Sequence, residues 1–254
     1  MSHKIYDKTN MIKKEDESDI KKRFFVPKIN LGTVEIDGEE HNHIANVMRF
    51  KVGDEIILIA DDEFDYYGTI TDIKKNVTLV SVTKKVPNQA NPKIEVTAFV
   101  AMNKREPMTL IVRMLSELGV TNLVPIITKW TLSQDVTDKM DRYQKIANQS
   151  AKQCRRSKTM KVENPIKLAE AIKLFKDFDV VYFAYENEDF QKMKAGIKAQ
   201  KVAFIIGPVA GFDKDEAEQI TSAGAISISL GKRILKADTA TIMLASLITD
   251  FYNN

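Results

Sequence analysis

The chain has 254 residues, of which 44% are hydrophobic and 29% charged, with a net charge of +3. This composition is ordinary for a globular protein with one large or two unequal domains, and so small a charge does not by itself indicate a nucleic-acid partner. The single cysteine, Cys154, excludes an internal disulfide, and three histidines without a cysteine cluster predict that no metal is bound. The first twenty residues are polar, and no apolar run approaches the roughly 20 residues needed to cross a bilayer. We therefore expect a cytoplasmic protein without a membrane partner.

The N-terminal third is predicted to form a flexible lead-in over residues 1–20 and a small β-rich domain over residues 21–88. In this domain, short runs of β-branched and aromatic residues are separated by turn residues, a pattern typical of strands. The pattern indicates a small barrel with one short helix at 39–48. The predicted strands are 24–26, 33–36, 55–59, 66–70 and 77–82.

A change of composition marks the segment Pro87–Pro92, whose two prolines and four small or polar residues are typical of a linker. Strands and helices then alternate over residues 93–254, which predicts an α/β domain with a largely parallel sheet covered by helices on both faces. The predicted strands are 94–101, 122–127, 179–185, 201–206 and 225–230, and the predicted helices are 105–118, 139–157, 165–176, 213–223 and 238–252.

A basic block lies between residues 139 and 161, which contain eight lysines and arginines but only one acid. On a helical projection Cys154 falls on the apolar side, which indicates a packed thiol, while Lys145, Lys152 and Arg156 fall on the opposite side. A helix face without interspersed acids favours contact with phosphates, and the alternative is an ordinary solvated face.

Two apolar strands in the last third each end in a glycine-bearing loop, at 207–212 and at 231–237. Ligands of open α/β sheets bind where loops leave the carboxyl ends of strands, so we predict one shared small-molecule pocket. The first loop matches neither a Walker loop nor a dinucleotide fingerprint, and a capping box at Asp213 and Glu216 places it directly before a helix.

Cations follow the second glycine at Lys232, Arg233 and Lys236. These cations are compatible with contact to RNA phosphates and equally with a solvated turn, and the residues alone do not decide between the two. Asp238 is predicted to cap the final helix.

Taken together, these segments resemble the RsmE-type ribosomal RNA methyltransferases of the SPOUT superfamily, from about Arg23 to the C-terminus. The order and spacing of the matching pieces make the resemblance specific. It implies an α/β protein with an N-terminal PUA-like β-barrel followed by a SPOUT domain with a C-terminal deep trefoil knot. The matching pieces are Arg23–Phe25, 43–54, 116–120, Pro125, Gln153–Cys154, Arg156, 206–208, Gly211–Phe212, Glu216, Leu230–Gly231, 233–235 and Thr239–Ala240.

The activity that the resemblance implies is methylation of a uridine at its ring N3 in small-subunit ribosomal RNA, with S-adenosylmethionine as cofactor. The implied partners are ribosomal RNA or the small ribosomal subunit and a second copy of the chain in a homodimer. The implied cofactor-binding residues are Phe183, Ala184, Ile206, Gly207, Pro208, Gly211, Leu230, Gly231, Ile234 and Leu235.

Residues for RNA binding and catalysis follow from the same resemblance and from the chemistry of uridine. Its N3 proton must be removed by a carboxylate base, or the negative charge that spreads to the ring oxygens must be stabilised by cations. Asp238 and Lys236 are the catalytic candidates for these roles. The expected RNA-binding residues are Arg23, Arg49, Lys145, Lys152, Arg156 and Arg233.

The sequence departs from the family pattern at six positions. Val209 and Ala210 stand where the first loop usually carries a glutamate and the first of two paired glycines. The other four exchanges are Lys236 for arginine, Asp238 for glutamate, Lys152 for glutamate and Arg155 for glycine. These departures motivate two alternatives, a non-catalytic RNA-binding relative and a knot methyltransferase with a different RNA target.

Overall fold

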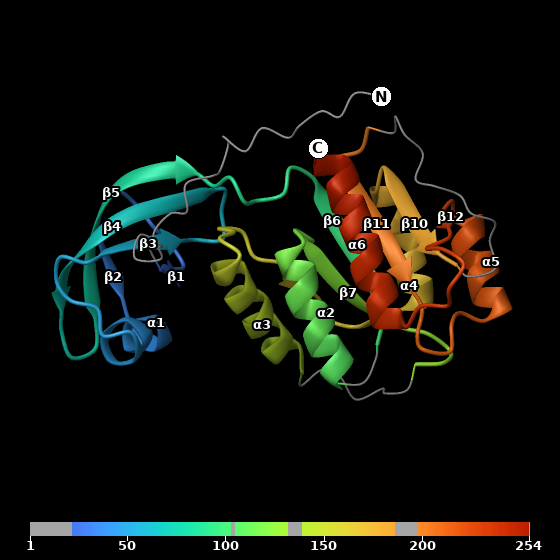
Figure 1. Cartoon of the computed structure of the whole chain (residues 1–254), viewed down its shortest axis with the longest axis horizontal. Coiled ribbons are helices and arrows are strands. Elements are labelled where there is room, and N and C mark those ends of the chain that lie inside the picture. The colour runs from blue at the N-terminus through green and yellow to red at the C-terminus, as the bar shows by residue number, and fades with distance from the viewer. Residues whose placement is uncertain (1–21, 103–104, 132–138, 186–197, 254) are drawn as a thin grey trace, which may run out of the picture. The chain divides into compact units, whose positions relative to one another are not determined.

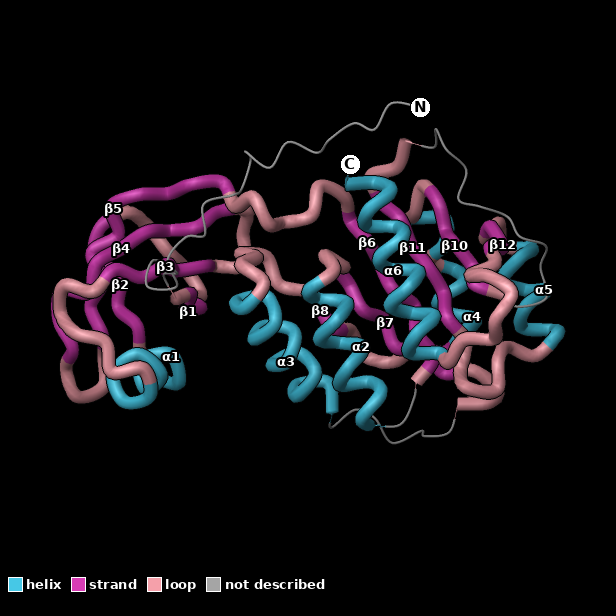
Figure 2. Tube along the Cα trace, viewed as in Figure 1, coloured by secondary structure: helices cyan, strands magenta, loops and turns pink. Residues whose placement is uncertain are grey.

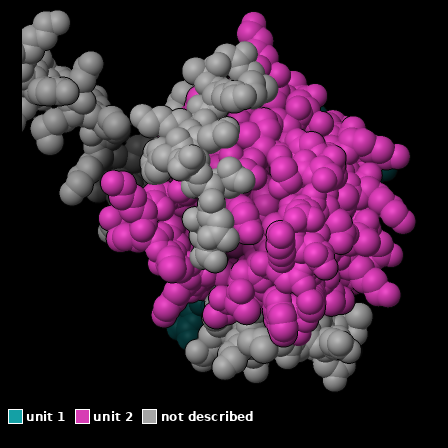
Figure 3. Space-filling view, turned by 90° about the vertical axis from the view of Figure 1, so that its right-hand side faces the viewer, with its two compact units in different colours: residues 1–60, 65–86 teal, residues 61–64, 87–254 magenta. Residues whose placement is uncertain are grey.

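The computed structural model describes residues 22–102, 105–131, 139–185 and 198–253. The chain divides into two compact units, residues 1–60 with 65–86 and residues 61–64 with 87–254. Figure 3 colours them teal and magenta and views the second from the side of its helix α5 (Lys214–Ser222). Among the described residues, no helix is long and apolar enough to span a membrane. In the same part of the chain, no group of three or more histidine, cysteine, aspartate or glutamate side chains is arranged to hold a metal ion.

The first unit is a curled five-stranded sheet in the order β1-β3-β4-β5-β2 (Figure 1). Strand β1 is parallel to β3, whereas β3 pairs with β4 and β2 pairs with β5 in antiparallel fashion. All five predicted strands form, and the predicted helix forms as a short α-helix that continues into a π-helical turn. The elements are β1 (Arg23–Phe25), β2 (Gly32–Ile36), α1 (Gly38–Asn42), η2 (His43–Val47), β3 (Glu55–Ile59), β4 (Phe64–Ile73) and β5 (Thr78–Pro87).

The core of the first unit forms around Phe24, whose ring meets the rings of His43 and Phe50 edge-on at centroid distances of 5.7 and 5.8 Å. Its neighbour Arg23 points to the other side of the strand and donates to the carboxylate of Asp65 at 2.8 Å. Both of these charged side chains are largely buried, so Arg23 is part of the internal framework of this unit.

The second unit contains a seven-stranded sheet whose path runs β12-β10-β11-β6-β7-β8, with β9 also beside β7. Its strand pairs are parallel, as the alternation of strands and helices predicts. The strands are β6 (Glu95–Ala101), β7 (Asn122–Ile127), β8 (Lys161–Val162), β9 (Ile166–Lys167), β10 (Val180–Ala184), β11 (Lys201–Ile206) and β12 (Ile226–Ile228).

Helices cover both faces of this sheet, because its central strands bury side chains on both sides (Figure 1). In β11, for example, Phe204 faces the core under α2, α3 and α6, whereas Ile205 faces the core under α4 and α5. The helices are α2 (Arg105–Glu117), α3 (Met140–Gln153), α4 (Leu168–Lys173), the 3₁₀ turn η4 (Phe175–Asp177), α5 (Lys214–Ser222) and α6 (Ala237–Asn253).

Helices α3, α4, α5 and α6 begin one to three residues from their predicted starts, and two of these differences change the place of a predicted residue or element. Helix α4 begins at Leu168, later than expected, because Ile166 and Lys167 instead pair with β7 as strand β9. Helix α6 begins at Ala237, so Asp238 lies in its first turn and is not the residue that precedes the helix.

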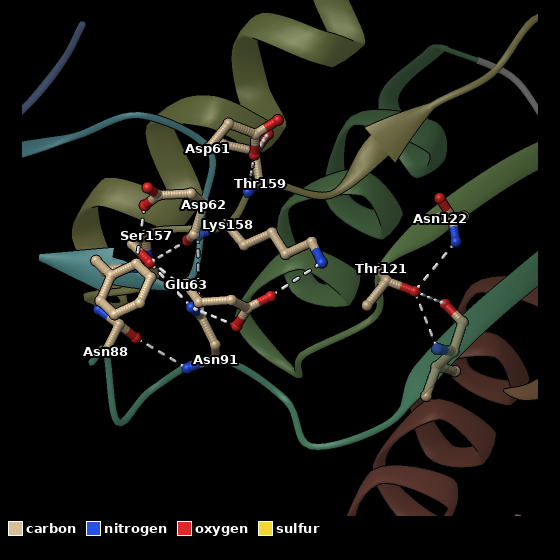
Figure 4. A network of polar contacts seen from close by, with 12 residues as sticks. Asp61, Asp62, Glu63, Asn88, Asn91, Thr121, Asn122, Ser157, Lys158 and Thr159 are labelled. Carbon is tan, nitrogen blue, oxygen red and sulfur yellow. Dashed lines mark hydrogen bonds and ion pairs between the residues drawn. The ribbon is translucent and has the colours of Figure 1, made fainter. Parts of the chain in front are cut away.

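A polar network within the second unit joins the segment 61–64 to the loop that follows α3 (Figure 4). The Asp61 carboxylate accepts hydrogen bonds from the backbone N–H and the hydroxyl of Thr159 at 2.7 and 2.8 Å. The Ser157 hydroxyl donates to the carbonyl of Asp62 at 2.6 Å. These contacts fix the conformation of the loop that follows α3.

The segment predicted as a linker is also held within the second unit. The Asn88 side chain donates to the carbonyl of Arg155 at 2.8 Å. The Asn91 side chain donates to the hydroxyl of Ser157 at 2.9 Å (Figure 4). The amide oxygen of Asn88 also accepts the N–H groups of Ala90 and Asn91, so side-chain amides satisfy backbone groups in both segments.

Candidate functional site

A cavity of about 400 Å³ lies at the carboxyl ends of β10, β11 and β12, lined by the loops that follow β11 and β12. Figure 2 draws these loops in pink. The loop 207–212 follows β11 and the loop 229–236 follows β12, so the predicted shared pocket is present. Its residues are mostly apolar or glycine. The lining comprises Ala184, Tyr185, Ile206, Gly207, Pro208, Val209, Ala210, Gly211, Phe212, Ser229, Leu230, Gly231, Lys232, Arg233, Ile234, Leu235, Ala237 and Ala240.

The first loop depends on glycine at two positions. A Cβ at residue 207 would lie 2.9 Å from Cδ2 of Phe212, too close for any side chain unless the ring moves. Gly211 adopts a φ of 76°, and its N–H donates to the carbonyl of Pro208 at 2.9 Å. It is the only residue of this loop with a positive φ. Ala210 therefore replaces the usual family glycine without backbone strain.

The second loop turns at Gly231, whose N–H donates to the hydroxyl of Ser229 at 3.3 Å. Lys232 and Arg233 at its tip are exposed, and the side chain of Ile234 is 86% exposed although it lines the cavity. The rim of the pocket is thus cationic and apolar, and no carboxylate belongs to its described lining. An anionic or amphipathic ligand is favoured at this rim.

Nine of the ten predicted cofactor-binding residues line the cavity. Phe183 does not, because its side chain is fully buried and its ring packs against Tyr185 and Phe212 at centroid distances of 5.1 and 5.4 Å. Its side chain packs behind the wall, so Phe183 is the one predicted cofactor-binding residue outside the described lining. Phe212 lines the cavity and was not predicted, although it directly follows the predicted Gly211.

The two catalytic candidates flank Ala237, which lines the cavity at the start of α6. Lys236 is exposed, and its carbonyl accepts the N–H of Ala240 at 2.8 Å. The Asp238 carboxylate is half-buried and accepts the N–H of Thr239 at 2.8 Å. Both lie at the N-terminal end of α6, where the helix dipole favours negative charge.

The loop 207–212 ends at the N-terminus of α5, where the predicted capping box is confirmed. The Asp213 carboxylate accepts the N–H of Glu216, and the Glu216 carboxylate accepts the N–H of Asp213, both at 3.1 Å. Lys129, just after β7, donates its ammonium to Asp213 and its backbone N–H to Glu216. Lys129 holds the pKa of the Asp213 carboxyl below its ordinary value, and Asp213 raises the pKa of Lys129.

Comparison with known families decides the class of this fold and site. A family model described as RNA methyltransferase domain matches residues 89–249, which is more than half of the chain. The chain belongs to the RNA methyltransferase family. A second model, RNA methyltransferase PUA domain, matches residues 36–80 of the first unit.

Individual relatives agree with this assignment. The chain is 30% identical to ribosomal RNA small subunit methyltransferase E of Mesomycoplasma hyopneumoniae over 206 residues, 80% of this chain and 88% of the relative. It is 28% identical to the protein of the same name in Rickettsia conorii over 215 residues, 82% of this chain and 86% of the relative. A solved structure of the protein of that name from Neisseria gonorrhoeae, bound to S-adenosyl methionine, is also similar. The TM-score is 0.85 and the sequence identity is 21%, and the match covers 91% of this chain and 98% of that chain. The resemblance seen in the sequence is confirmed.

The predicted RNA-binding residues of this methyltransferase fall into two groups. Arg49, Lys145 and Arg233 are exposed and Lys152 is half-buried, so all four are at the surface. The second group, Arg23 and Arg156, is internal. Arg23 is committed to its ion pair with Asp65.

For Arg156 the RNA-binding prediction is wrong, because its side chain is only 1% exposed. Helix α3 ends at Gln153 instead of residue 157, so Arg156 is not on its solvent face. The guanidinium donates to the carbonyls of Ser116 and Val120 at 2.6 and 3.0 Å, where α2 ends. It therefore binds one carbonyl in the last turn of α2, which lacks a partner within the helix, and one in the segment that follows the helix.

The end of α3 explains a departure from the family pattern. Arg155, which stands where the family usually has glycine, has a φ of 68°, in the left-handed region that glycine adopts most readily. Cys154 just before it is partly buried, and burial raises the pKa of its thiol. A raised pKa disfavours the reactive thiolate, in agreement with the predicted packed thiol.

Proposed function

We propose that this methyltransferase binds S-adenosylmethionine in the cavity at the ends of β10, β11 and β12 and methylates N3 of a uridine in small-subunit ribosomal RNA. The observation that carries the proposal is the meeting of the two glycine-bearing loops in one cavity within a chain of the RNA methyltransferase family. The names of the relatives and the ligand of the Neisseria gonorrhoeae structure support the substrate and the cofactor.

The cavity suits this cofactor. Its volume of about 400 Å³ falls in the range of small-molecule sites. Close approach of a ligand to backbone N–H and C=O groups is possible where Gly207 and Gly231 carry no side chain, and Leu230 and Leu235 offer apolar walls. When bound, S-adenosylmethionine supplies a methyl group on a sulfonium, which is already a good leaving group. The protein is then required mainly to align the nucleophile with that methyl group.

The residues at the start of α6 are proposed to supply the rest of the chemistry. The Asp238 carboxylate accepts the N3 proton of the uridine, and the Lys236 ammonium, together with the N-terminal dipole of α6, stabilises negative charge on the ring oxygens. Their position on either side of the cavity-lining Ala237 supports these roles. Asp238 stands where other family members have glutamate, and Lys236 stands where they have arginine. The charges are therefore the same, but the Asp238 side chain is one methylene shorter and the Lys236 ammonium lacks the planar fork of a guanidinium.

For RNA, we propose contacts from cations at the surface of each unit. Arg49 serves in the first unit, and Lys145, Lys152 and Arg233 serve in the second. Phosphate contacts of this kind give affinity that falls steeply with salt.

We further infer a deep trefoil knot in the C-terminal segment and a homodimer. Strand β12 lies beside β10 although it follows β11 in the chain, which is compatible with a threaded connection. Helix α6 leaves Met243, Leu247 and Phe251 partly exposed at four-residue spacing. An apolar stripe of this kind on a helix is typical of a protein interface, and a second copy of the chain is the proposed occupant.

The test is calorimetric titration with S-adenosylmethionine and S-adenosylhomocysteine, followed by methyl transfer to small-subunit RNA. Saturable cofactor binding and incorporation of methyl groups are expected. Asp238→Asn and Lys236→Met should lower kcat about 10²-fold or more while cofactor affinity stays within twofold. Salt-sensitive RNA binding without cofactor binding would instead identify a non-catalytic RNA-binding relative.

A further inference from the structure

The segment after β7 carries an exposed aromatic ring on a rigid turn next to the proposed cofactor loop. Thr128 and Thr131 close this turn, because the Thr131 N–H donates to the Thr128 carbonyl at 3.2 Å and the Thr128 N–H donates to the Thr131 hydroxyl at 2.8 Å. Lys129 and Trp130 form its tip. The indole of Trp130 is 49% exposed, an unusual position for so large an apolar side chain.

The tip is also fixed from the outside. The ammonium of Lys129 is bound by Asp213, and its backbone N–H donates to Glu216 at 2.8 Å. The same ammonium lies 5.4 Å from the centroid of the Trp130 ring, within the range of a cation–π contact. The ring is therefore pre-organised, and an aromatic side chain held in this way loses little entropy when it binds a partner.

Connectivity places the ring next to the pocket. Phe212 lines the cavity, Asp213 follows it directly, and Asp213 holds Lys129, the neighbour of Trp130. Figure 1 shows the segment after β7 running toward the N-terminal end of α5. The carboxyl ends of parallel strands share one edge of the sheet, so β7 delivers this turn to the edge that carries the cavity.

We propose that Trp130 is a substrate-binding residue that stacks on an unpaired base of the RNA, with Lys129 as its positioning residue. This inference rests on the proposed function. Uridine N3 lies on the edge used for base pairing, so the target base must be unpaired when the methyl group is transferred. Unpaired bases are recognised by stacking on aromatic side chains, and stacking tolerates any base because every base has a π-face.

The experiment uses the full-length protein and a single-stranded oligonucleotide with the sequence around the methylated uridine. Because Trp130 is the only tryptophan of the chain, its fluorescence reports the contact without labelling. Addition of the oligonucleotide should quench the signal, and addition of S-adenosylhomocysteine alone should not. Trp130→Ala should weaken RNA affinity roughly 5- to 150-fold, the range found for loss of one stacking residue.

Three controls make the result specific. Trp130→Phe keeps an aromatic face and should retain most of the affinity, whereas Trp130→Leu keeps an apolar side chain and should not. Leu174→Ala removes another partly exposed apolar side chain and should leave RNA affinity unchanged. S-adenosylhomocysteine affinity should be the same in every variant.

Two outcomes overturn the inference and leave the proposed function intact. One is a wild-type protein that methylates RNA while Trp130→Ala binds it equally well. The other is a Trp130→Ala protein that sediments as a monomer where the wild type sediments as a dimer, which would assign the ring to a protein interface. If the wild-type protein binds neither cofactor nor RNA, the proposed function fails and this inference fails with it.

Discussion

Gly207 lies so close to the ring of Phe212 that a Cβ at position 207 would be 2.9 Å from Phe212 Cδ2. Both residues line the proposed cofactor cavity, so the shape of its wall depends on the absence of one side chain. Gly207→Ala should force the ring to move and lower the affinity for S-adenosylhomocysteine at least tenfold, about 1.4 kcal/mol by titration calorimetry.

A double-mutant cycle tests the cause of that loss. In a Phe212→Leu background the added methyl group has more room, so Gly207→Ala should cost less there than in the wild type. Ala210→Gly is the matched loop control and should leave affinity within about twofold, since residue 210 requires no positive φ. Equal losses in both backgrounds would show that the Phe212 contact is not the reason.

Arg156 is predicted to determine stability and not RNA affinity. Arg156→Met removes two hydrogen bonds from a charged donor to carbonyls at the end of α2 and should lower the free energy of unfolding by about 3 kcal/mol in urea titrations. The control is Lys145→Met, which should change stability by less than about 0.5 kcal/mol and weaken RNA binding. An unchanged unfolding midpoint in Arg156→Met would contradict the buried placement.

Arg155→Gly should stabilise the protein. The left-handed backbone of Arg155 costs a non-glycine residue roughly 1–2 kcal/mol, partly offset by the larger entropy of glycine in the unfolded chain, so a net gain of about 0.5–1 kcal/mol is expected. Gln149→Gly, in the exposed interior of α3, should instead destabilise by about 1 kcal/mol. Destabilisation by both changes would argue against a positive φ at residue 155.

The pairing of Lys129 with Asp213 predicts a pH dependence. The folded-state pKa of Asp213 lies below its ordinary value of 3.8, so its contribution to stability is present above that value and is lost as the pH falls through the folded-state pKa. A carbon-13 NMR titration should place the pKa of Asp213 below 3.8 in the wild type. Lys129→Met should move it upward, and no upward movement would mean that the ion pair does not form in solution.

Much of the fold follows from local pattern. Apolar runs identified ten of the twelve strands of the described residues, and three of them, 55–59, 122–127 and 201–206, have the predicted bounds. The two-residue strands β8 and β9 were not predicted, because so short a run leaves no pattern. The pocket was predictable for a topological reason, since glycine-bearing loops after parallel strands gather at one edge of a sheet. The start of α6, by contrast, was predicted one residue too late. A pattern of apolar residues does not determine which residue precedes the first helical turn.

The errors arise where tertiary contacts override local pattern. A helical projection extended through residue 156 gives Arg156 a solvent face, but the left-handed residue at 155 ends α3 and turns that side chain inward. The glycine usual at position 155 was the one available signal of this turn. Trp130 gave no signal in sequence, because the turn that carries it is held by a bond between Lys129 and Asp213, 84 residues apart.

Methylation of uridine N3 is tested by mass spectrometry of nucleosides from small-subunit RNA after incubation with the protein and isotope-labelled S-adenosylmethionine. Labelled N3-methyluridine is expected with the wild-type protein, and much less of it with Gly207→Ala at a cofactor concentration near the wild-type Kd. Labelled methyl groups on any other atom, or none despite saturable cofactor binding, would contradict the proposed function.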